Sequence, residues 1–166
     1  MMYVFFYEKE IPGKGMGVFA SEFVPKGTLV WKLSDPKIYT KEEWDKLPED
    51  IKKVCYPDAE DNFIYSEGKG ESWNHSCDAN TWWTADSELS AKRDIKKNEE
   101  ITYDYASTDI DAKIKGMGEE YPWECKCGIP NCRKKLHWNA ILKPEIYELN
   151  IGHIPSWVEK FVQEAK

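Results

Sequence analysis

The chain has 166 residues, 41% of them hydrophobic, and this composition excludes intrinsic disorder and allows one compact domain. Its 30 acidic and 23 basic side chains give a formal net charge of −7, which argues against a direct nucleic-acid ligand. No apolar run approaches the roughly 20 residues of a membrane-spanning helix, so we expect no membrane partner.

The five cysteines are unevenly spread along the chain. Cys125, Cys127 and Cys132 lie close together, whereas Cys55 and Cys77 lie far upstream. An odd count without a recognisable secretion signal argues against a disulfide framework. We therefore expect an intracellular protein, in the cytoplasm or the nucleus.

Alternate glycines mark the N-terminal segment GKGMGVFA at residues 13–20. Glycine lets a backbone approach a ligand closely or take a positive φ, so the segment either cradles a cofactor or is a simple turn. It has neither the glycine spacing of a dinucleotide-binding loop nor the lysine placement of a phosphate loop.

Short β-like segments dominate the rest of the sequence. The run TLVWKL at residues 28–33 is rich in strand formers, and similar pieces follow at residues 63–65, 81–84, 88–91 and 101–103. Asp-, Asn- and Lys-rich turns separate them. We therefore predict a mainly β fold with short helices, of the α+β class.

Two capping-box patterns predict where helices begin. Thr40 followed by Glu43 begins a helical pattern that Pro48 breaks, and Ser156 followed by Glu159 begins a terminal helix. We expect the terminal helix to pack on the body of the domain through its apolar side chains.

The segment NHSCDAN at residues 74–80 holds an amide, an imidazole, a hydroxyl, a thiol and a carboxylate. On a regular strand His75 and Cys77 would share one face. A Cys–His nucleophile pair and a polar loop bonded to itself are both consistent with this pattern.

The segment EEITYDY at residues 99–105 alternates, so that Tyr103 and Tyr105 face the same side if the strand is regular. Phenol rings hold a cation by their faces and orient an amine by their hydroxyls. The alternative is two core tyrosines beside a solvated Asp104.

The tail segment CKCGIPNCR supplies three thiols at C-x-C-x4-C spacing, which suits tetrahedral zinc but provides three of four ligands. A catalytic three-ligand zinc is one interpretation, and we favour a structural site completed from elsewhere. The candidates for the fourth ligand are Cys77 first, and then Cys55, His75 and His137.

In this order and at these separations, the four segments resemble the SET domain of protein-lysine methyltransferases with its cysteine-rich post-SET tail. The family pattern reads G-x-G, then N-H-S-C-x-P-N, then G-E-E-[LI]-T-[FY]-D-Y, then C-x-C-G-x3-C-R-x2-L. The resemblance covers about residues 4–136, and residues 137–166 resemble the C-terminal extension of small stand-alone SET proteins.

The resemblance implies a SET fold of small curved sheets, in which the NHSC and YDY segments pass one another in a knot-like crossing. It also implies three parts. These are a SET domain over residues 1–120, a post-SET zinc-binding segment over residues 121–137, and a C-terminal helical extension over residues 138–166 that packs on the SET core.

The resemblance further implies the roles of individual residues. Tyr105 would be the active-site phenol, and Tyr103 would limit the number of methyl groups added. The residues implied to bind S-adenosyl-L-methionine are Lys14, Gly15, Met16, Gly17, Asn74, His75, Tyr105, Trp123 and Leu136. The implied ligands of a structural Zn²⁺ are Cys77, Cys125, Cys127 and Cys132.

The implied function is a protein-lysine N-methyltransferase that mono- or dimethylates a basic protein, such as a histone tail. The rivals are a non-catalytic SET-like module that binds peptides, and a hydrolase with Cys77 as nucleophile. Acidic residues that would attract a basic substrate, or simply form a solvated surface, are Asp58, Glu60, Asp61, Asp109, Asp111, Glu119 and Glu120.

Three departures from the family pattern stand out. Ala79 replaces a proline, Glu71 and Ser72 stand where many members have Arg-Phe, and Lys97-Asn98 replaces an Ala/Lys-Gly turn. None of them removes a residue with an implied role.

Overall fold

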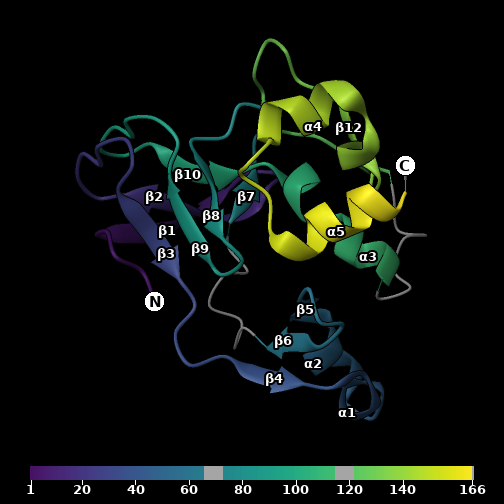
Figure 1. Ribbon diagram of the computed structural model, residues 1–166. Helices are drawn as coiled ribbons and strands as arrows, with labels where there is room; N and C mark the ends of the chain where they lie inside the picture. Colours follow the sequence, from purple (N-terminus) through teal and green to yellow (C-terminus); the bar gives the residue numbers. More distant parts are fainter. Residues whose placement is uncertain (66–72, 115–121, 166) are drawn as a thin grey trace.

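A computed structural model describes residues 1–65, 73–114 and 122–165 (Figure 1). In these ranges the strands form small sheets and the helices are short, as expected from the sequence. Glu71, Ser72, Glu119 and Glu120 lie outside the described residues.

The first sheet has the strand order β1-β2-β10-β7. Its antiparallel hairpin consists of β1 (Phe6–Ile11) and β2 (Gly15–Ala20), and β2 pairs with β10 (Glu100–Tyr103). Strand β7 (Asn74–His75) runs parallel to β10, with Tyr103 opposite His75. This parallel pairing brings the NHSC and YDY segments together.

The second sheet supplies much of the main core. It consists of β3 (Leu29–Lys32), β9 (Glu88–Ala91) and β8 (Thr81–Ala85), all antiparallel. The β9 range is the one expected from the sequence. Apolar side chains of both sheets, among them Val18, Val30, Leu89 and Ile101, form one buried cluster.

The third sheet belongs to a separate small module between β3 and β7. Strands β4 (Lys37–Tyr39), β6 (Phe63–Tyr65) and β5 (Cys55–Pro57) pack with helices α1 (Lys41–Asp45) and α2 (Glu49–Lys53).

The helix pattern expected in this module is confirmed in detail. Thr40 and Glu43 form the capping box of α1, and Pro48 is the residue before α2. The core of the module is small and centres on Trp44, Cys55 and Phe63.

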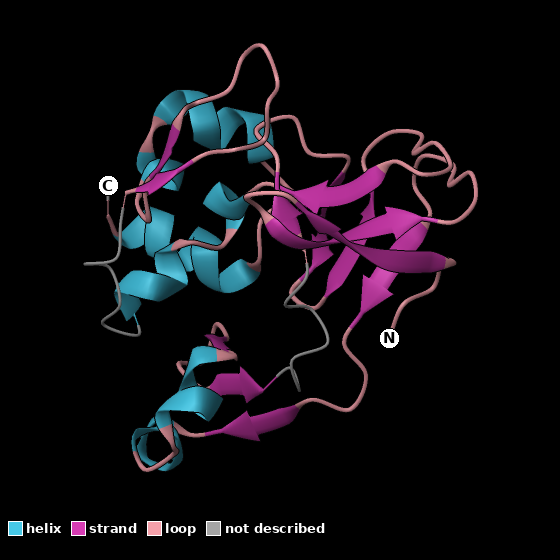
Figure 2. Ribbon diagram, turned by 180° about the vertical axis from the view of Figure 1, so that it is seen from behind, coloured by secondary structure: helices cyan, strands magenta, loops and turns pink. Residues whose placement is uncertain are grey.

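The helices that follow β10 gather on one side of the sheets (Figure 2). Within the described residues they are η1 (Tyr105–Ser107), α3 (Ile110–Ile114), η3 (Ala140–Leu142), α4 (Pro144–Asn150) and α5 (Ser156–Glu164). Ala106, Ile110, Ile141, Trp157 and Val158 are buried together, so the terminal helix packs on the domain as expected. None of the described helices is long and apolar enough to cross a membrane.

The prediction of a capping box formed by Ser156 and Glu159 is wrong. Helix α5 begins at Ser156, its N-cap is Pro155, and no side chain caps it from within. Instead Asp86 accepts hydrogen bonds from the Ser156 backbone N–H at 2.6 Å and from the Ser156 hydroxyl at 2.5 Å. Asp86, in the β8–β9 turn, therefore accepts the N–H at the start of the helix that Glu159 was expected to accept.

The Lys97-Asn98 turn has a simple physical basis. Asn98 takes a φ of 66°, in the left-handed region that asparagine tolerates better than most residues. Its N–H donates to the carbonyl of Ala20 at 2.7 Å, which ties the turn to β2.

Candidate active site and cysteine cluster

The paired β7 and β10 segments position the two tyrosines. Strand β10 ends at Tyr103, and Tyr105 opens η1, so the regular alternation expected for them does not hold. Their ring centroids nevertheless lie 5.0 Å apart. Tyr105 Oη donates to the carbonyl of Trp73 at 2.7 Å, and its backbone N–H donates to His75 Nδ1 at 3.2 Å.

Burial controls the protonation of these groups. It raises the pKa of Tyr105 to about 12, with additional effects of Asp109 and Glu100, and raises that of Tyr103 well above the usual value. Burial also lowers the pKa of His75 to about 4, although Asp104 opposes the shift. At neutral pH both phenols and the imidazole are therefore uncharged.

The N-terminal hairpin adjoins this site through Asn74. Asn74 Nδ2 donates to the carbonyl of Met16 at 2.9 Å and to Glu100 Oε1 at 2.8 Å. Lys14 Nζ forms an ion pair with Glu100 Oε2 at 2.7 Å. Lys14, Met16 and Asn74 are therefore brought together, and Glu100 is the shared acceptor.

Gly17 makes a close approach to this group. A Cβ at Gly17 would lie 2.6 Å from Ile11 Cδ1, 2.9 Å from Glu100 Oε1 and 3.1 Å from Asn74 Nδ2. The φ of Gly17 is not positive, so backbone conformation does not require a glycine here. The lack of space for a Cβ does. Gly15, in contrast, takes a φ of 87°.

The cysteine cluster joins the tail to β7. One potential ligand atom from each of His75, Cys77, Cys125 and Cys127 lies within 4.8 Å of the others. Cys77 Sγ and Cys125 Sγ are 3.7 Å apart. Cys132 is outside that group of four, but its thiol interacts with those of Cys125 and Cys127.

These distances fit a zinc ion. Two sulfur ligands at about 2.3 Å from a tetrahedral zinc lie about 3.8 Å apart, close to the separation of Cys77 and Cys125. Burial would raise the pKa of Cys127, but the backbone N–H groups of Cys77 and Ile129 outweigh it and lower the pKa to about 7. That shift favours the thiolate that a metal binds.

The tail also reaches the N-terminal hairpin. Strands β11 (Trp123–Glu124) and β12 (Lys135–Leu136) pair so that Trp123 lies opposite Leu136. Leu136 is buried and Trp123 is exposed. Lys126 Nζ donates to the carbonyl of Gly13 at 2.8 Å. The tail therefore contacts both β7 and the hairpin.

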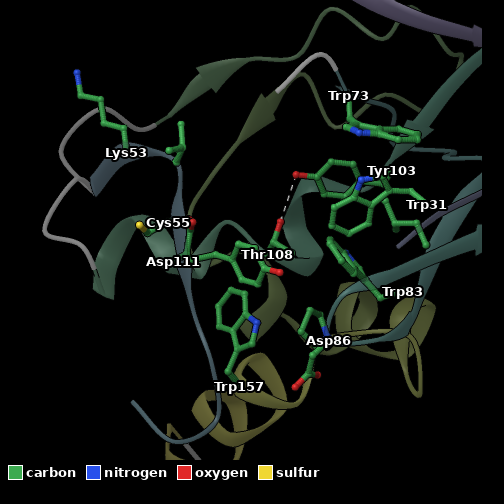
Figure 3. Close-up of a pocket in the computed structure, with 14 residues that line it drawn as sticks. Trp31, Lys53, Cys55, Trp73, Trp83, Asp86, Tyr103, Thr108, Asp111 and Trp157 are labelled. Carbon is green, nitrogen blue, oxygen red and sulfur yellow. Dashed lines mark hydrogen bonds between the residues drawn. The ribbon is translucent and has the colours of Figure 1, made fainter. Parts of the chain in front are cut away.

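A cavity of about 240 Å³ lies beside Tyr103, between the core, strand β5 and helix α5. Figure 3 shows aromatic side chains around it, and at its edge Thr108 Oγ1 donates to the Tyr103 hydroxyl oxygen at 3.5 Å. Its aromatic walls come from Trp31, Tyr56, Trp73, Trp83, Tyr103 and Trp157. Such walls suit an aliphatic chain or a cation.

A comparison with protein families matches residues 15–106, more than half of the chain, to the SET domain. The chain belongs to the SET-domain family. This confirms the resemblance and the fold inferred from the sequence.

Curated relatives of this SET domain include histone methyltransferases. A Debaryomyces hansenii "Histone-lysine N-methyltransferase, H3 lysine-36 specific" is 29% identical over 137 residues, which is 73% of this chain and 18% of that protein. A Danio rerio "Histone-lysine N-methyltransferase SUV39H1-A" is 36% identical over 89 residues, 38% of this chain and 22% of that protein. The chain thus spans less than a quarter of these relatives.

Solved structures share the fold. The methyltransferase domain of human SETMAR aligns with a TM-score of 0.57 at 20% identity, over 81% of this chain and 58% of that one. KRYPTONITE in complex with mCHG DNA and SAH aligns with a TM-score of 0.59 at 21% identity, over 82% and 30%.

Sequence reasoning missed several residues of this SET-domain site. The sequence assigns no role to Glu100, whereas in the structure it is the acceptor shared by Lys14 and Asn74. Trp31, Trp83 and Trp157 line the cavity although nothing in the local sequence distinguishes them from core tryptophans. These tryptophans are distinguished by their position relative to other elements of the fold. Local sequence patterns do not encode that position.

Proposed function

We propose that this SET domain transfers a methyl group from S-adenosyl-L-methionine to the ε-amine of a lysine in a basic protein, such as a histone tail. The observation that carries the proposal is the pairing of β7 with β10, with Tyr105 bonded to both His75 and the carbonyl of Trp73. The methyltransferase names of the relatives, and the SAH held by KRYPTONITE, support it.

In this proposal the cofactor lies between the hairpin, β7 and the tail. Two sets of contacts support this. Asn74 bonds the carbonyl of Met16 and shares Glu100 with Lys14, and Lys126 contacts Gly13. The cofactor supplies an electrophilic methyl group. The residues proposed to hold it are Lys14, Gly15, Met16, Gly17, Asn74, His75, Tyr105, Trp123 and Leu136.

We assign a structural zinc ion to Cys77, Cys125, Cys127 and Cys132, and not to His75. Because His75 Nδ1 accepts the N–H of Tyr105, a neutral His75 carries its proton on Nε2. That nitrogen faces Cys77 Sγ at 3.1 Å as a donor, so it has no lone pair for a metal. His75 would then orient a sulfur ligand and leave the fourth position to Cys132.

The chemistry requires a neutral amine. A lysine of pKa about 10.4 is neutral in about 1 part in 2,500 at pH 7, a cost of roughly 4.6 kcal/mol. Desolvation in the aromatic cavity and the positive charge of the cofactor would both lower that pKa. Tyr105 would orient the amine, and because its own pKa is about 12 it stays a neutral phenol. We assign no general base.

Fewer acidic side chains are available to a basic substrate than the composition suggests. Asp61 pairs with Lys160 at 3.0 Å, and Asp58 accepts backbone N–H groups of Glu60 and Asn62. Asp109 is buried. These carboxylates are engaged within the chain, so we propose the cavity beside Tyr103, more than the acidic surface, as the feature that selects a lysine side chain.

We further infer that the three parts expected from the sequence, residues 1–120, 121–137 and 138–166, work as one catalytic unit in the nucleus or the cytoplasm. We propose no direct contact with nucleic acid.

Calorimetric titration with S-adenosyl-L-methionine tests the proposal against a non-catalytic scaffold. We expect one binding site per chain in the zinc-loaded protein. No detectable binding would leave the peptide-binding module as the better account. Alkylation of Cys77 by iodoacetamide in the zinc-loaded protein would instead favour the Cys–His hydrolase, because zinc ligation protects a thiolate.

A further inference from the structure

Arg133 follows the last cysteine of the tail and reaches back toward β7. Its Nε donates to Cys77 Sγ at 3.3 Å, and its backbone N–H donates to the same sulfur at 3.4 Å. Its Nη2 donates to Asp104 Oδ1. One guanidinium thus contacts both the cysteine cluster and the residue between the two tyrosines.

Asp104 fixes the turn that carries Tyr105. It is the N-cap of η1, and its Oδ1 accepts the N–H of Ala106 at 3.0 Å. A capping side chain holds the first turn of a helix in place. The position of Asp104 therefore determines the position of the Tyr105 backbone, from which the ring extends.

The link between Arg133 and Asp104 is shielded from solvent. The two side chains are 22% and 16% exposed. Hydrogen bonds between ionised groups are about twice as strong as neutral ones, and screening by salt is weaker away from the surface. A lysine could not replace the arginine, because only the planar fork presents several N–H donors in fixed directions.

We propose that Arg133 is the positioning residue that couples the tail to catalysis, holding Asp104, and through it Tyr105, in place when the tail lies against Cys77. This inference rests on the proposed methyl transfer and adds a role for a residue to which that proposal gives none. Docking of the tail and alignment of the Tyr105 phenol become one event, because the same guanidinium makes both contacts.

The test compares Arg133→Met with Arg93→Met in the zinc-loaded chain. Arg93 is the other arginine of the sequence and forms its own ion pair with Glu99 at 2.7 Å, so it is a matched control. Measured quantities are kcat and KM for methyl transfer, zinc per chain, and the ring resonances of Tyr105 in protein with isotope-labelled tyrosine.

We expect Arg133→Met to lower kcat by about 10–100-fold, the usual cost of losing a residue behind a metal site, with zinc content unchanged. The Tyr105 resonance should shift, and Arg133→Lys should not restore kcat. Arg93→Met should change none of these. In an Asp104→Asn background the Arg133 substitution should cost little more, because the two residues act in one chain of contacts.

Three outcomes would overturn the inference. They are an unchanged kcat in Arg133→Met, an unmoved Tyr105 resonance, or a loss of activity that follows loss of zinc and returns when zinc is added. A wild-type chain that binds no cofactor and transfers no methyl group would instead refute the proposed function, and the Tyr105 resonance would still report on Arg133.

Discussion

Tyr103 and Tyr105 lie ring against ring, yet their hydroxyl groups have different surroundings. The Tyr105 hydroxyl donates to the carbonyl of Trp73, while the Tyr103 hydroxyl lies at the edge of the aromatic cavity beside Thr108. The first is held in a fixed direction. The second is available to hold a water molecule in space that additional methyl groups would need.

This difference predicts the effect of Tyr103→Phe. Removal of the hydroxyl should free that space. If the domain chiefly mono- or dimethylates its substrate, as the family resemblance implies, Tyr103→Phe should add more methyl groups than the wild type. Mass spectrometry of the product measures the distribution. The control is Tyr147→Phe, which removes a hydroxyl that donates to Glu159, and neither of these residues lines the cavity beside Tyr103. If Tyr103→Phe gives the wild-type product distribution, the role assigned to Tyr103 is wrong.

At the residue scale, the sequence predicted which residue types belong to the site better than it predicted the contacts between them. The motif residues His75 and Tyr105 do meet, but motif spacing could not show that Glu100 accepts from both Lys14 and Asn74. It also left the glycine segment open between a turn and a cofactor cradle. The close approach at Gly17 depends on side chains from β1, β7 and β10, which local patterns do not relate.

At the scale of elements, local signals worked where the partners are local. Thr40 and Glu43 are three residues apart, and their capping box forms. Ser156 and Glu159 have the same spacing, but Asp86, 70 residues away, takes the Ser156 N–H. A nearby carboxylate from another element displaced the local partner, and no sequence rule for a helix start includes that competition.

The Asp86 contact predicts how α5 is anchored. Asp86→Ala should lower the free energy of unfolding by about 1 kcal/mol, the usual value of a helix cap, because it leaves the Ser156 N–H without that acceptor. Urea unfolding measures it. Asp45→Ala removes an exposed carboxylate paired with Lys41 and should change stability by less than about 0.5 kcal/mol. Equal effects of the two substitutions would contradict the anchoring role.

At the scale of the whole molecule, the tail connects parts that are distant in sequence. The cysteine cluster bonds β7 to the tail, Lys126 reaches the hairpin, and α5 closes the cavity beside Tyr103. Sequence periodicity predicted the strands and the mainly β class. It could not predict the parallel pairing of β7 with β10, which arises from tertiary packing of two very short strands.

Removal of zinc should therefore weaken the molecule as a whole. A structural zinc contributes directly to folding free energy, so chelation should lower Tm by about 10 °C and also weaken cofactor binding. Differential scanning calorimetry measures the Tm, calorimetric titration measures cofactor binding, and metal analysis measures the zinc content. Cys77→Ser should lose zinc, whereas Cys55→Ser, in the core of the small module, should keep it. Equal zinc content in the two variants would contradict the assigned ligands.

The most direct test of the account is transfer of a radiolabelled methyl group from S-adenosyl-L-methionine to histones or to proteins of a cell lysate. Wild type and Tyr147→Phe should label a lysine of a basic protein. Tyr105→Phe should still bind the cofactor but should label the substrate lysine at least about 100-fold more slowly, as expected when a group that orients the reactants is lost. Equal labelling by wild type and Tyr105→Phe, or no labelling by the zinc-loaded wild type, would contradict it.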